Sequence, residues 1–220
     1  MSNTLAKMEA DTLAAAREAG EAGETKKAAD CGLAFEDAAD FIETAPPPLD
    51  PIIENAFERG DKVELVGGSK QRKSFFLIDL LFHLAAGRDW LGFKIPKRRR
   101  VVYVNLELKR DWVHRRIHRT ARAYGMAAED VRGFFRVVNA RGKGGIVREH
   151  LAAFLRGEDA DLVALDPRYK LMLPGESENA GEGVAGILAM MDAIAENGSA
   201  VLVVHHDSKG DQAGKSGPRD

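Results

Sequence analysis

The feature that most constrains the fold is a regular alternation between short apolar runs and longer amphipathic segments. The apolar runs follow residue 60 and span Val63–Val66, Val101–Asn105, Phe135–Val138, Leu162–Leu165 and Val201–Val204. Apolar residues recur at helical spacing between these runs, over 74–86, 109–124, 146–156 and 182–196. Nearly continuous hydrophobicity is typical of strands covered on both faces, and strands that alternate with helices form right-handed crossovers. The sequence therefore predicts a three-layer α/β domain with a mainly parallel central sheet. In such sheets, ligands bind at the carboxyl ends of strands.

Three consecutive prolines, Pro46–Pro48, separate this domain from a different kind of N-terminal sequence. Residues 1–45 are rich in Ala, Glu and Lys with only scattered apolar residues, so we expect a flexible or weakly helical arm. Prolines remove backbone donors and fix φ, so we place a boundary here and assign residues 46–220 to the core domain. Residues 49–59 are expected to form a short helix that ends at Gly60.

Composition excludes several classes of protein. The formal net charge of −2 gives no whole-chain attraction to nucleic acid or membranes, so any basic surface must be local. Cys31 is the only cysteine, which excludes an internal disulfide and favours a reducing compartment. The most apolar stretch, 75–86, is interrupted by Asp79 and His83 and is too short to span a bilayer. We therefore expect a soluble cytoplasmic protein without a signal peptide and without a membrane partner.

The stretch "VELVGGSKQRKS", residues 63–74, follows the first predicted strand and opens the first predicted helix. It nearly matches G-x-x-x-x-G-K-[ST], the pattern of a loop (P-loop) whose backbone N–H groups cradle phosphates, but an arginine stands at the second glycine position. In such a loop the lysine reaches the β and γ phosphates and the serine hydroxyl binds Mg²⁺. The residues predicted to bind a nucleotide are Gly67, Gly68, Ser69, Lys70, Gln71, Arg72, Lys73 and Ser74. The alternative is an ordinary glycine-rich turn, and Arg72 could either crowd the phosphates or point outward.

Two other predicted strands end in a carboxylate. "DLVALDP", residues 161–167, ends in Asp166, as in a Walker B strand whose carboxylate holds Mg²⁺, although many strands end in Asp-Pro as a simple turn. "VVYVNLE", residues 101–107, ends in Glu107, which could polarise the water that attacks the γ phosphate. A solvated glutamate at a strand end is the commoner fate. The position of Glu107 on the strand after the P-loop helix favours the catalytic hypothesis.

Histidines and basic residues supply two further candidates. His205 and His206 end the last predicted strand, but adjacent strand residues point to opposite faces and would not share one metal. A polar sensor of the γ phosphate, with Ser208 and Lys209 nearby, is the better hypothesis. The basic clusters comprise Lys97–Arg100 and, in one helix, Arg110, Arg115, Arg116, Arg119 and Arg122. A solvated helix face is their ordinary interpretation, and nucleic-acid contact is the alternative, with few aromatic residues to stack on bases.

The order of these motifs resembles a known family. The segments "GGSKQRKSFFLIDLLFHLAAGRDWLG", "VVYVNLE", "ALDPRYKL", "SENAGEG" and "VLVVHHDSKGDQAGKSG" are together similar to RecA-like AAA-type ATPases related to plasmid and phage RepA replicative helicases. The resemblance covers residues 46–217 and implies a RecA-like core, ATP and Mg²⁺ as ligands, and a hexameric ring with ATP between subunits. It implies Lys73 and Ser74 as the P-loop pair, Asp166 as the Walker B carboxylate, Glu107 as the catalytic glutamate and His206 as the sensor. Arg72 departs from the pattern, and the chain ends at Asp220 where family members continue, so we expect a C-terminally truncated core.

Three functions are compatible with these residues. The leading hypothesis is a Mg-dependent ATPase that acts on DNA as a replication helicase or helicase-like motor of plasmid or phage type, with single-stranded DNA as a candidate partner. The loops 167–180 and 207–217 would face the DNA. Arg72 and the short C-terminus motivate the alternative of a nucleotide-binding regulatory or assembly module with little hydrolysis. A recombinase or clock-type RecA-like ATPase shares the same core. A nucleotide-free α/β domain is disfavoured by four separately placed motifs.

Overall fold

The computed structural model describes residues 33–68, 70–176 and 181–207; for Glu182, His206 and Asp207 it describes the backbone alone. The chain divides into two units, residues 1–48 and 49–220, which are described separately. In the first unit, helix α2 (Ala38–Glu43) begins at Asp37, whose side chain accepts a hydrogen bond from the Ala39 N–H at 2.9 Å. Residues 1–32 of the predicted arm lie outside the described residues.

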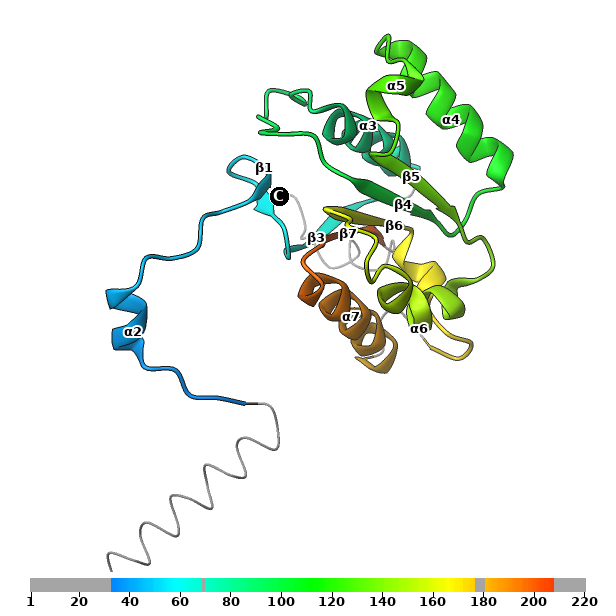
Figure 1. The fold of residues 1–220 in the computed structure, drawn as a ribbon. Coiled ribbons are helices and arrows are strands. Elements are labelled where there is room, and N and C mark those ends of the chain that lie inside the picture. The colour runs from blue at the N-terminus through cyan, green and yellow to red at the C-terminus, as the bar shows by residue number, and fades with distance from the viewer. Residues whose placement is uncertain (1–32, 69, 177–180, 208–220) are drawn as a thin grey trace, which may run out of the picture. The chain divides into compact units, whose positions relative to one another are not determined.

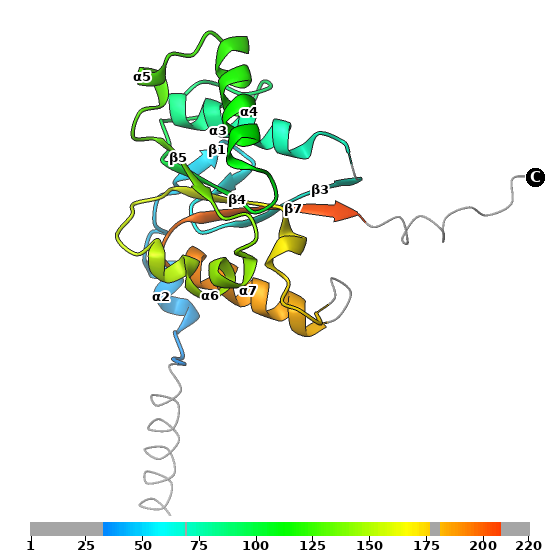
Figure 2. The same cartoon turned by 90° about the vertical axis from the view of Figure 1, so that its right-hand side faces the viewer.

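A five-stranded parallel sheet forms the centre of the second unit (Figures 1 and 2). Its strand order is β3-β7-β6-β4-β5, and every neighbouring pair is parallel. The strands are β3 (Lys62–Gly68), β4 (Val101–Asn105), β5 (Phe135–Asn139), β6 (Leu162–Asp166) and β7 (Ala200–Asp207). Each predicted strand is present. The parallel pairing follows from the crossover helices that connect the strands.

Helices cover both faces of this sheet, which gives the three layers seen in Figure 2. One face carries α3 (Lys73–Ala86), α4 (Arg110–Ala123) and the short α5 (Ala128–Val131). The other carries α6 (Gly144–Phe154) and α7 (Gly181–Glu196). The predicted three-layer α/β fold is confirmed, and the four long helices begin and end within two residues of their predicted bounds. The short α5 and the 3₁₀ helix η1 (Arg168–Leu171) were not predicted.

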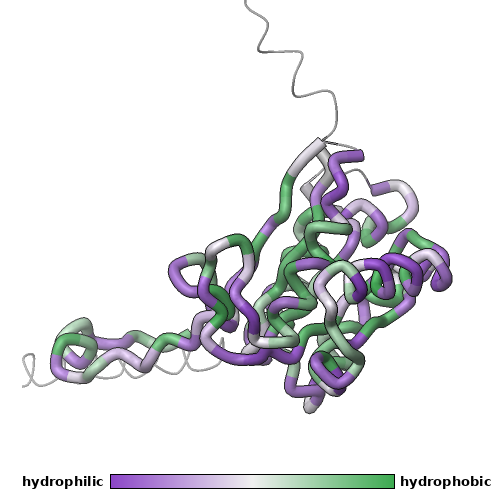
Figure 3. The backbone as a smooth tube through the Cα atoms, turned by 90° about the horizontal axis from the view of Figure 1, so that it is seen from above, coloured by the Kyte–Doolittle hydropathy of each residue, from purple (hydrophilic) through white to green (hydrophobic). Residues whose placement is uncertain are grey.

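The core consists of two hydrophobic clusters, one on each face of the sheet. Alternate residues of β4 divide between them, because Val101 and Tyr103 pack against α3 whereas Val102 and Val104 pack against α6 and α7. This division explains why the strands are apolar without a polar alternation. Figure 3 shows hydrophobic residues gathered in the interior of the core unit, with hydrophilic residues more frequent toward its periphery. Among the described residues, no helix is both long and apolar enough to cross a membrane.

The predicted helix over 49–59 was wrong. This segment forms an antiparallel hairpin of β1 (Pro51–Ile53) and β2 (Phe57–Glu58). Its turn places Asn55 at φ 59°, a left-handed conformation that interrupts a helix. Ile52 and Ile53 are buried in the core next to α3, so tertiary burial outweighed local helix propensity.

Candidate functional site

The loop between β3 and α3 lies at the carboxyl end of an edge strand and leads into a helix N-terminus. Strand β3 ends at Gly68 and α3 begins at Lys73; Ser69 lies outside the described residues. The Lys73 ammonium is buried and donates to the carbonyls of Gly67 and Gly68 at 2.5 and 2.8 Å. The Gly68 N–H donates to Gln71 Oε1 at 2.8 Å. The Lys73 ammonium is therefore hydrogen-bonded to the backbone of its own loop.

Arg72 has the backbone conformation that the missing glycine would supply. It stands at the N-cap of α3 with φ 60° and ψ 24°, in the left-handed region, and its side chain is exposed. Its carbonyl accepts the first bonds of the helix, from the N–H groups of Phe75 and Phe76 at 2.9 and 3.1 Å. Lys70 is also left-handed, with φ 64°. Arg72 thus adopts a conformation that glycine takes freely, at the cost of strain in a non-glycine residue.

Ser74 and Asp166 meet, although they come from different elements. Ser74 is the second residue of α3 and Asp166 ends β6, and the serine hydroxyl is hydrogen-bonded to the carboxylate. Tyr103 of β4 donates its hydroxyl to Asp166 Oδ2 at 2.8 Å. Because Tyr103 is fully buried and tied to this carboxylate, its pKa lies far above the usual range and the hydroxyl stays a donor.

Asp166 has a raised pKa, and burial is the main cause. Only 4% of the residue is exposed, so the charged form loses hydration. Hydrogen bonds from Ser74 and Tyr103, and the positive charge of Arg116, oppose this shift. The negative charge of Glu107 adds to it. A cation would compensate for the hydration that the ionised carboxylate has lost, so this site is well suited to bind one.

Glu107 lies just beyond β4 on a loop that Asn105 holds in place. The Asn105 side chain is buried, accepts from the Leu108 N–H at 2.9 Å and donates to the Leu108 carbonyl at 2.8 Å. It also donates to Asn139 Oδ1 at 3.2 Å, which links the ends of β4 and β5. Glu107 itself is exposed, and Tyr169 of η1 donates to its Oε1 at 3.0 Å. Two contacts therefore position Glu107: Asn105 fixes the backbone of its loop, and Tyr169 bonds its carboxylate.

The two histidines of β7 have different surroundings. The backbone of His206 pairs in register with Gly67, so its strand position is beside the P-loop; its side chain lies outside the described residues. His205 accepts a hydrogen bond at Nε2 from Arg168 at 2.8 Å, and Arg168 also contacts Glu64 at 2.9 Å. Within the described part of the chain, no group of three or more His, Cys, Asp or Glu side chains could hold a metal.

The basic cluster at 97–100 is partly structural, which corrects the expectation of a solvated or nucleic-acid-binding surface there. Arg99 is fully buried and contacts Asp50 at 2.6 Å, Asp161 at 3.4 Å and the Pro51 carbonyl. A buried guanidinium needs such partners because isolated burial of its charge is very costly. Arg116 in α4 instead lies over the Phe75 ring, 4.5 Å from its centroid.

Sequence reasoning missed three residues that organise the site. Tyr103 orients Asp166, Asn105 fixes the loop of Glu107, and Tyr169 contacts Glu107 itself. The signal for the first two was available, because a tyrosine and an asparagine interrupt the otherwise aliphatic run 101–105. Tyr169 gave no such signal, since its contact depends on the unpredicted helix η1.

Comparison with known proteins agrees with this geometry. The chain is similar to the crystal structure of a KaiC-like protein from the hyperthermophilic archaeon Pyrococcus horikoshii, with a TM-score of 0.51 and 18% identity over 74% of this chain and 72% of that one. This likeness shows a shared RecA-like fold. No curated protein matches the sequence. Residues 30–212 match the AAA domain family. The chain therefore belongs to the AAA domain family, as an ATPase-type nucleotide-binding domain built on a RecA-like P-loop fold.

Proposed function

We propose that the protein is a Mg-dependent ATPase that acts on DNA as a helicase-like motor of the plasmid and phage RepA type. The observation that carries this proposal is the meeting of Lys73, Ser74 and Asp166. A loop, a helix N-terminus and a separate strand bring together an ammonium, a hydroxyl and a carboxylate. This combination is what binding of a nucleoside triphosphate with its cation requires.

The phosphates would bind at the N-terminus of α3. Backbone N–H groups there have no helical acceptor and carry the positive end of the helix dipole. The Lys73 ammonium would exchange the carbonyls of Gly67 and Gly68 for phosphate oxygens, and Gln71 would release the Gly68 N–H to the same ligand. The ammonium would then face anionic oxygens instead of neutral carbonyls, and the Gly68 N–H would gain a charge-assisted hydrogen bond, which is stronger than its bond to the Gln71 amide.

The oxygen atoms of Ser74 and Asp166 fit Mg²⁺. They are already within hydrogen-bonding reach of each other, and Mg²⁺ takes one or two protein oxygens together with water and substrate phosphates. When bound, the ion would neutralise charge on the β and γ phosphates.

Glu107 would act as the general base toward water. It is exposed at the end of β4, and its charge reaches Asp166, so it faces the same region of the sheet edge. Asn105 and Tyr169 would position it, and His206, next to Gly67 on the neighbouring strand, would sense the γ phosphate. Assembly into a hexameric ring, with ATP between subunits, belongs to the same proposal and rests on the resemblance to RepA-type helicases.

A regulatory or assembly module with slow turnover is the second candidate. The hydrogen bonds within the P-loop favour this candidate, because the Lys73 ammonium and the Gln71 side chain are both bonded to backbone groups of Gly67 and Gly68 rather than free for a ligand.

Titration calorimetry with Mg-ATP, paired with phosphate release with and without single-stranded DNA, tests the proposal. Lys73→Ala should abolish ATP binding, whereas Glu107→Gln should bind ATP and lose hydrolysis. Unchanged ATP affinity in Lys73→Ala would contradict the assignment of the nucleotide site to this loop. Wild-type turnover no faster than that of Glu107→Gln would favour the regulatory module.

A further inference from the structure

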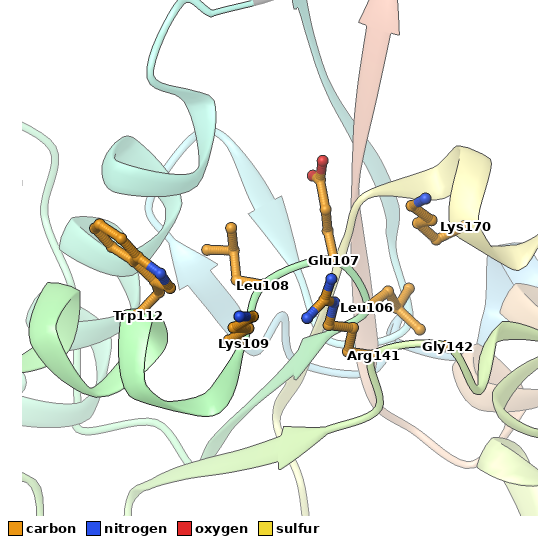
Figure 4. A pocket seen from close by; sticks show the side chains of 8 residues that line it. All are labelled: Leu106, Glu107, Leu108, Lys109, Trp112, Arg141, Gly142 and Lys170. Atoms are coloured by element: carbon orange, nitrogen blue, oxygen red, sulfur yellow. The ribbon is translucent and has the colours of Figure 1, made fainter.

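A cavity of about 520 Å³ opens beside Glu107 (Figure 4). In the strand order it lies toward β5, at the end of the sheet opposite β3, which leads into the P-loop. It lies at the carboxyl ends of β4 and β5 and is bounded by η1. The polar side chains and the aromatic ring that line it are Glu107, Lys109, Trp112, Arg141 and Lys170. Its volume is within the range of small-molecule and cofactor sites.

The cavity is positively charged. Lys109, Arg141 and Lys170 supply three cations against the single carboxylate of Glu107, which leaves a formal charge of +2. All three cations are exposed, and within residues 33–68, 70–176 and 181–207 none of them forms a salt bridge; the Lys170 ammonium lies over the Tyr169 ring, 4.7 Å from its centroid. Glu107 is already held by Tyr169, and in Figure 4 its carboxylate points away from Arg141. The cations are therefore available to an anion from outside.

Trp112 gives the cavity an aromatic wall. Its side chain is 54% exposed, whereas Trp90, the other tryptophan of the chain, is 6% exposed and donates to Asp79. The guanidinium of Arg115, in the same helix, lies 5.3 Å from the Trp112 ring centroid. An exposed indole flanked by cations is the arrangement on which nucleobases stack.

Gly144 fixes the distance between two walls of the cavity. A Cβ atom at this position would lie 1.7 Å from the Lys170 carbonyl oxygen, so only glycine allows α6 to approach η1 so closely. Arg141 lies three residues before Gly144, and Lys170 belongs to η1. Backbone packing thus sets the spacing of the two segments that carry these cations.

We propose that this cavity binds a single-stranded nucleic acid, with a base stacked on Trp112 and backbone phosphates on Lys109, Arg141 and Lys170. An acidic peptide would satisfy the cations but would leave the indole unused, so the aromatic wall favours nucleic acid. The inference rests on the proposed DNA-dependent ATPase and names where the strand binds. Lys170 follows Tyr169, so strand binding acts on the residue that holds Glu107 and thereby stimulates hydrolysis.

Fluorescence anisotropy with labelled single-stranded oligonucleotides, in DNA and RNA forms, measures this binding in the full chain. Arg141→Glu is expected to weaken binding at least about tenfold at 0.1 M salt and to reduce its salt dependence. Trp112→Ala is expected to weaken it about tenfold. Arg122→Glu makes the same charge change at an exposed arginine of α4 outside the cavity, and it should change affinity less than about twofold. Wild-type tryptophan fluorescence should be quenched by the oligonucleotide, and Trp112→Ala should lose the quenching.

Binding of Mg-ATP, measured in the same variants, separates this inference from the proposed function. Arg141→Glu and Trp112→Ala should keep wild-type ATP affinity and lose the stimulation of phosphate release by the oligonucleotide. Equal strand affinity in Arg141→Glu and Arg122→Glu would overturn the cavity assignment and leave the ATPase proposal standing. Displacement of the oligonucleotide by polyglutamate of equal charge, without tryptophan quenching, would also overturn it, in favour of an acidic peptide. A wild-type chain that binds neither ATP nor oligonucleotide would overturn both proposals.

Discussion

At the scale of single residues, Arg72 holds a backbone conformation that strains most side chains. Its φ of 60° belongs to the left-handed region, which glycine adopts freely and other residues adopt at a cost of about 1–2 kcal/mol. The surrounding helix start fixes this conformation, because the first helical N–H groups bond to the Arg72 carbonyl. The side chain remains exposed and does not occupy the loop.

Arg72→Gly should therefore raise the free energy of unfolding by about 1 kcal/mol, because the strain is removed. Mg-ATP affinity should stay the same or increase. Arg72→Val is the matched control, since a β-branched residue fits the left-handed region poorly, and it should lower stability. Chemical denaturation and calorimetry measure both effects. A less stable Arg72→Gly would mean that contacts of the arginine side chain outweigh its backbone strain.

Burial of Asp166 also costs stability, which its proposed role as a Mg²⁺ ligand would explain. Its pKa is raised by burial, so at neutral pH the ionised carboxylate destabilises the fold, and this penalty disappears as pH falls through the raised value. Asp166→Asn should add about 1 kcal/mol of stability at pH 7 and should lose Mg-dependent ATP binding. The stability gain should shrink as pH is lowered toward 4.

Thermal unfolding of wild type and Asp166→Asn between pH 4 and pH 8 tests whether the stability gain shrinks as pH falls. Asp192→Asn is a suitable control, because Asp192 is about half exposed and pairs with Lys62 on the surface. It should change stability by less than about 0.5 kcal/mol at every pH. A stability gain for Asp166→Asn that grew toward low pH would contradict the raised pKa of Asp166.

At the scale of elements, the alternation of apolar runs and amphipathic segments was enough to predict all five sheet strands and the four long helices. The hairpin of β1 and β2, the short α5 and helix η1 were not predicted, and the reasons are identifiable for the hairpin and for η1. The hairpin at 51–58 is stabilised by core burial of Ile52 and Ile53 and by the buried Arg99, which are contacts with distant parts of the chain. Helix η1 is a single short turn without a periodic pattern, and with it the contact between Tyr169 and Glu107 was missed.

The packing of α6 against η1 gives an element-scale prediction. Gly144→Ala should lower the free energy of unfolding by about 2–4 kcal/mol, because the new methyl group would overlap the Lys170 carbonyl oxygen. Gly145→Ala is the control in the same helix turn, since its Cβ would meet only the flexible Leu173 side chain, at 3.2 Å. Urea denaturation of both variants measures the difference. Equal stability of the two variants would show that η1 moves aside without cost.

At the scale of the whole molecule, the buried Arg99 joins segments that are far apart in the sequence. It links Asp50, at the start of the core unit, to Asp161, at the start of β6. The sequence presented this arginine as one of four basic residues in a row, and nothing local marked it as buried. Long-range ion pairs of this kind depend on the finished topology, which is why the site residues at strand ends were easier to predict than the residues that support them.

Asp50→Asn should lower the free energy of unfolding at pH 7 by about 2 kcal/mol, because Arg99 would keep its burial and lose a charged partner. The Arg99 and Lys97 contacts hold the pKa of Asp50 well below its usual range. Its stabilising contribution is therefore present above the unfolded pKa of about 4 and is lost as pH falls below it. Denaturation at pH 7 and pH 3 should show a smaller difference between wild type and variant at pH 3. A difference that is independent of pH would indicate a packing effect instead.

The left-handed residue at position 72 also bears on how nucleotide-binding loops are found. A motif written in letters is a shorthand for a series of dihedral angles, and the two descriptions separate wherever a side chain tolerates an unfavourable angle. A penalty of about 1 kcal/mol changes a population by a factor of about five, which a domain with an ordinary stability margin can absorb. A search that demands glycine passes over this chain, whereas one that asks for a left-handed residue before Lys-Ser, at the junction of a strand and a helix, detects it.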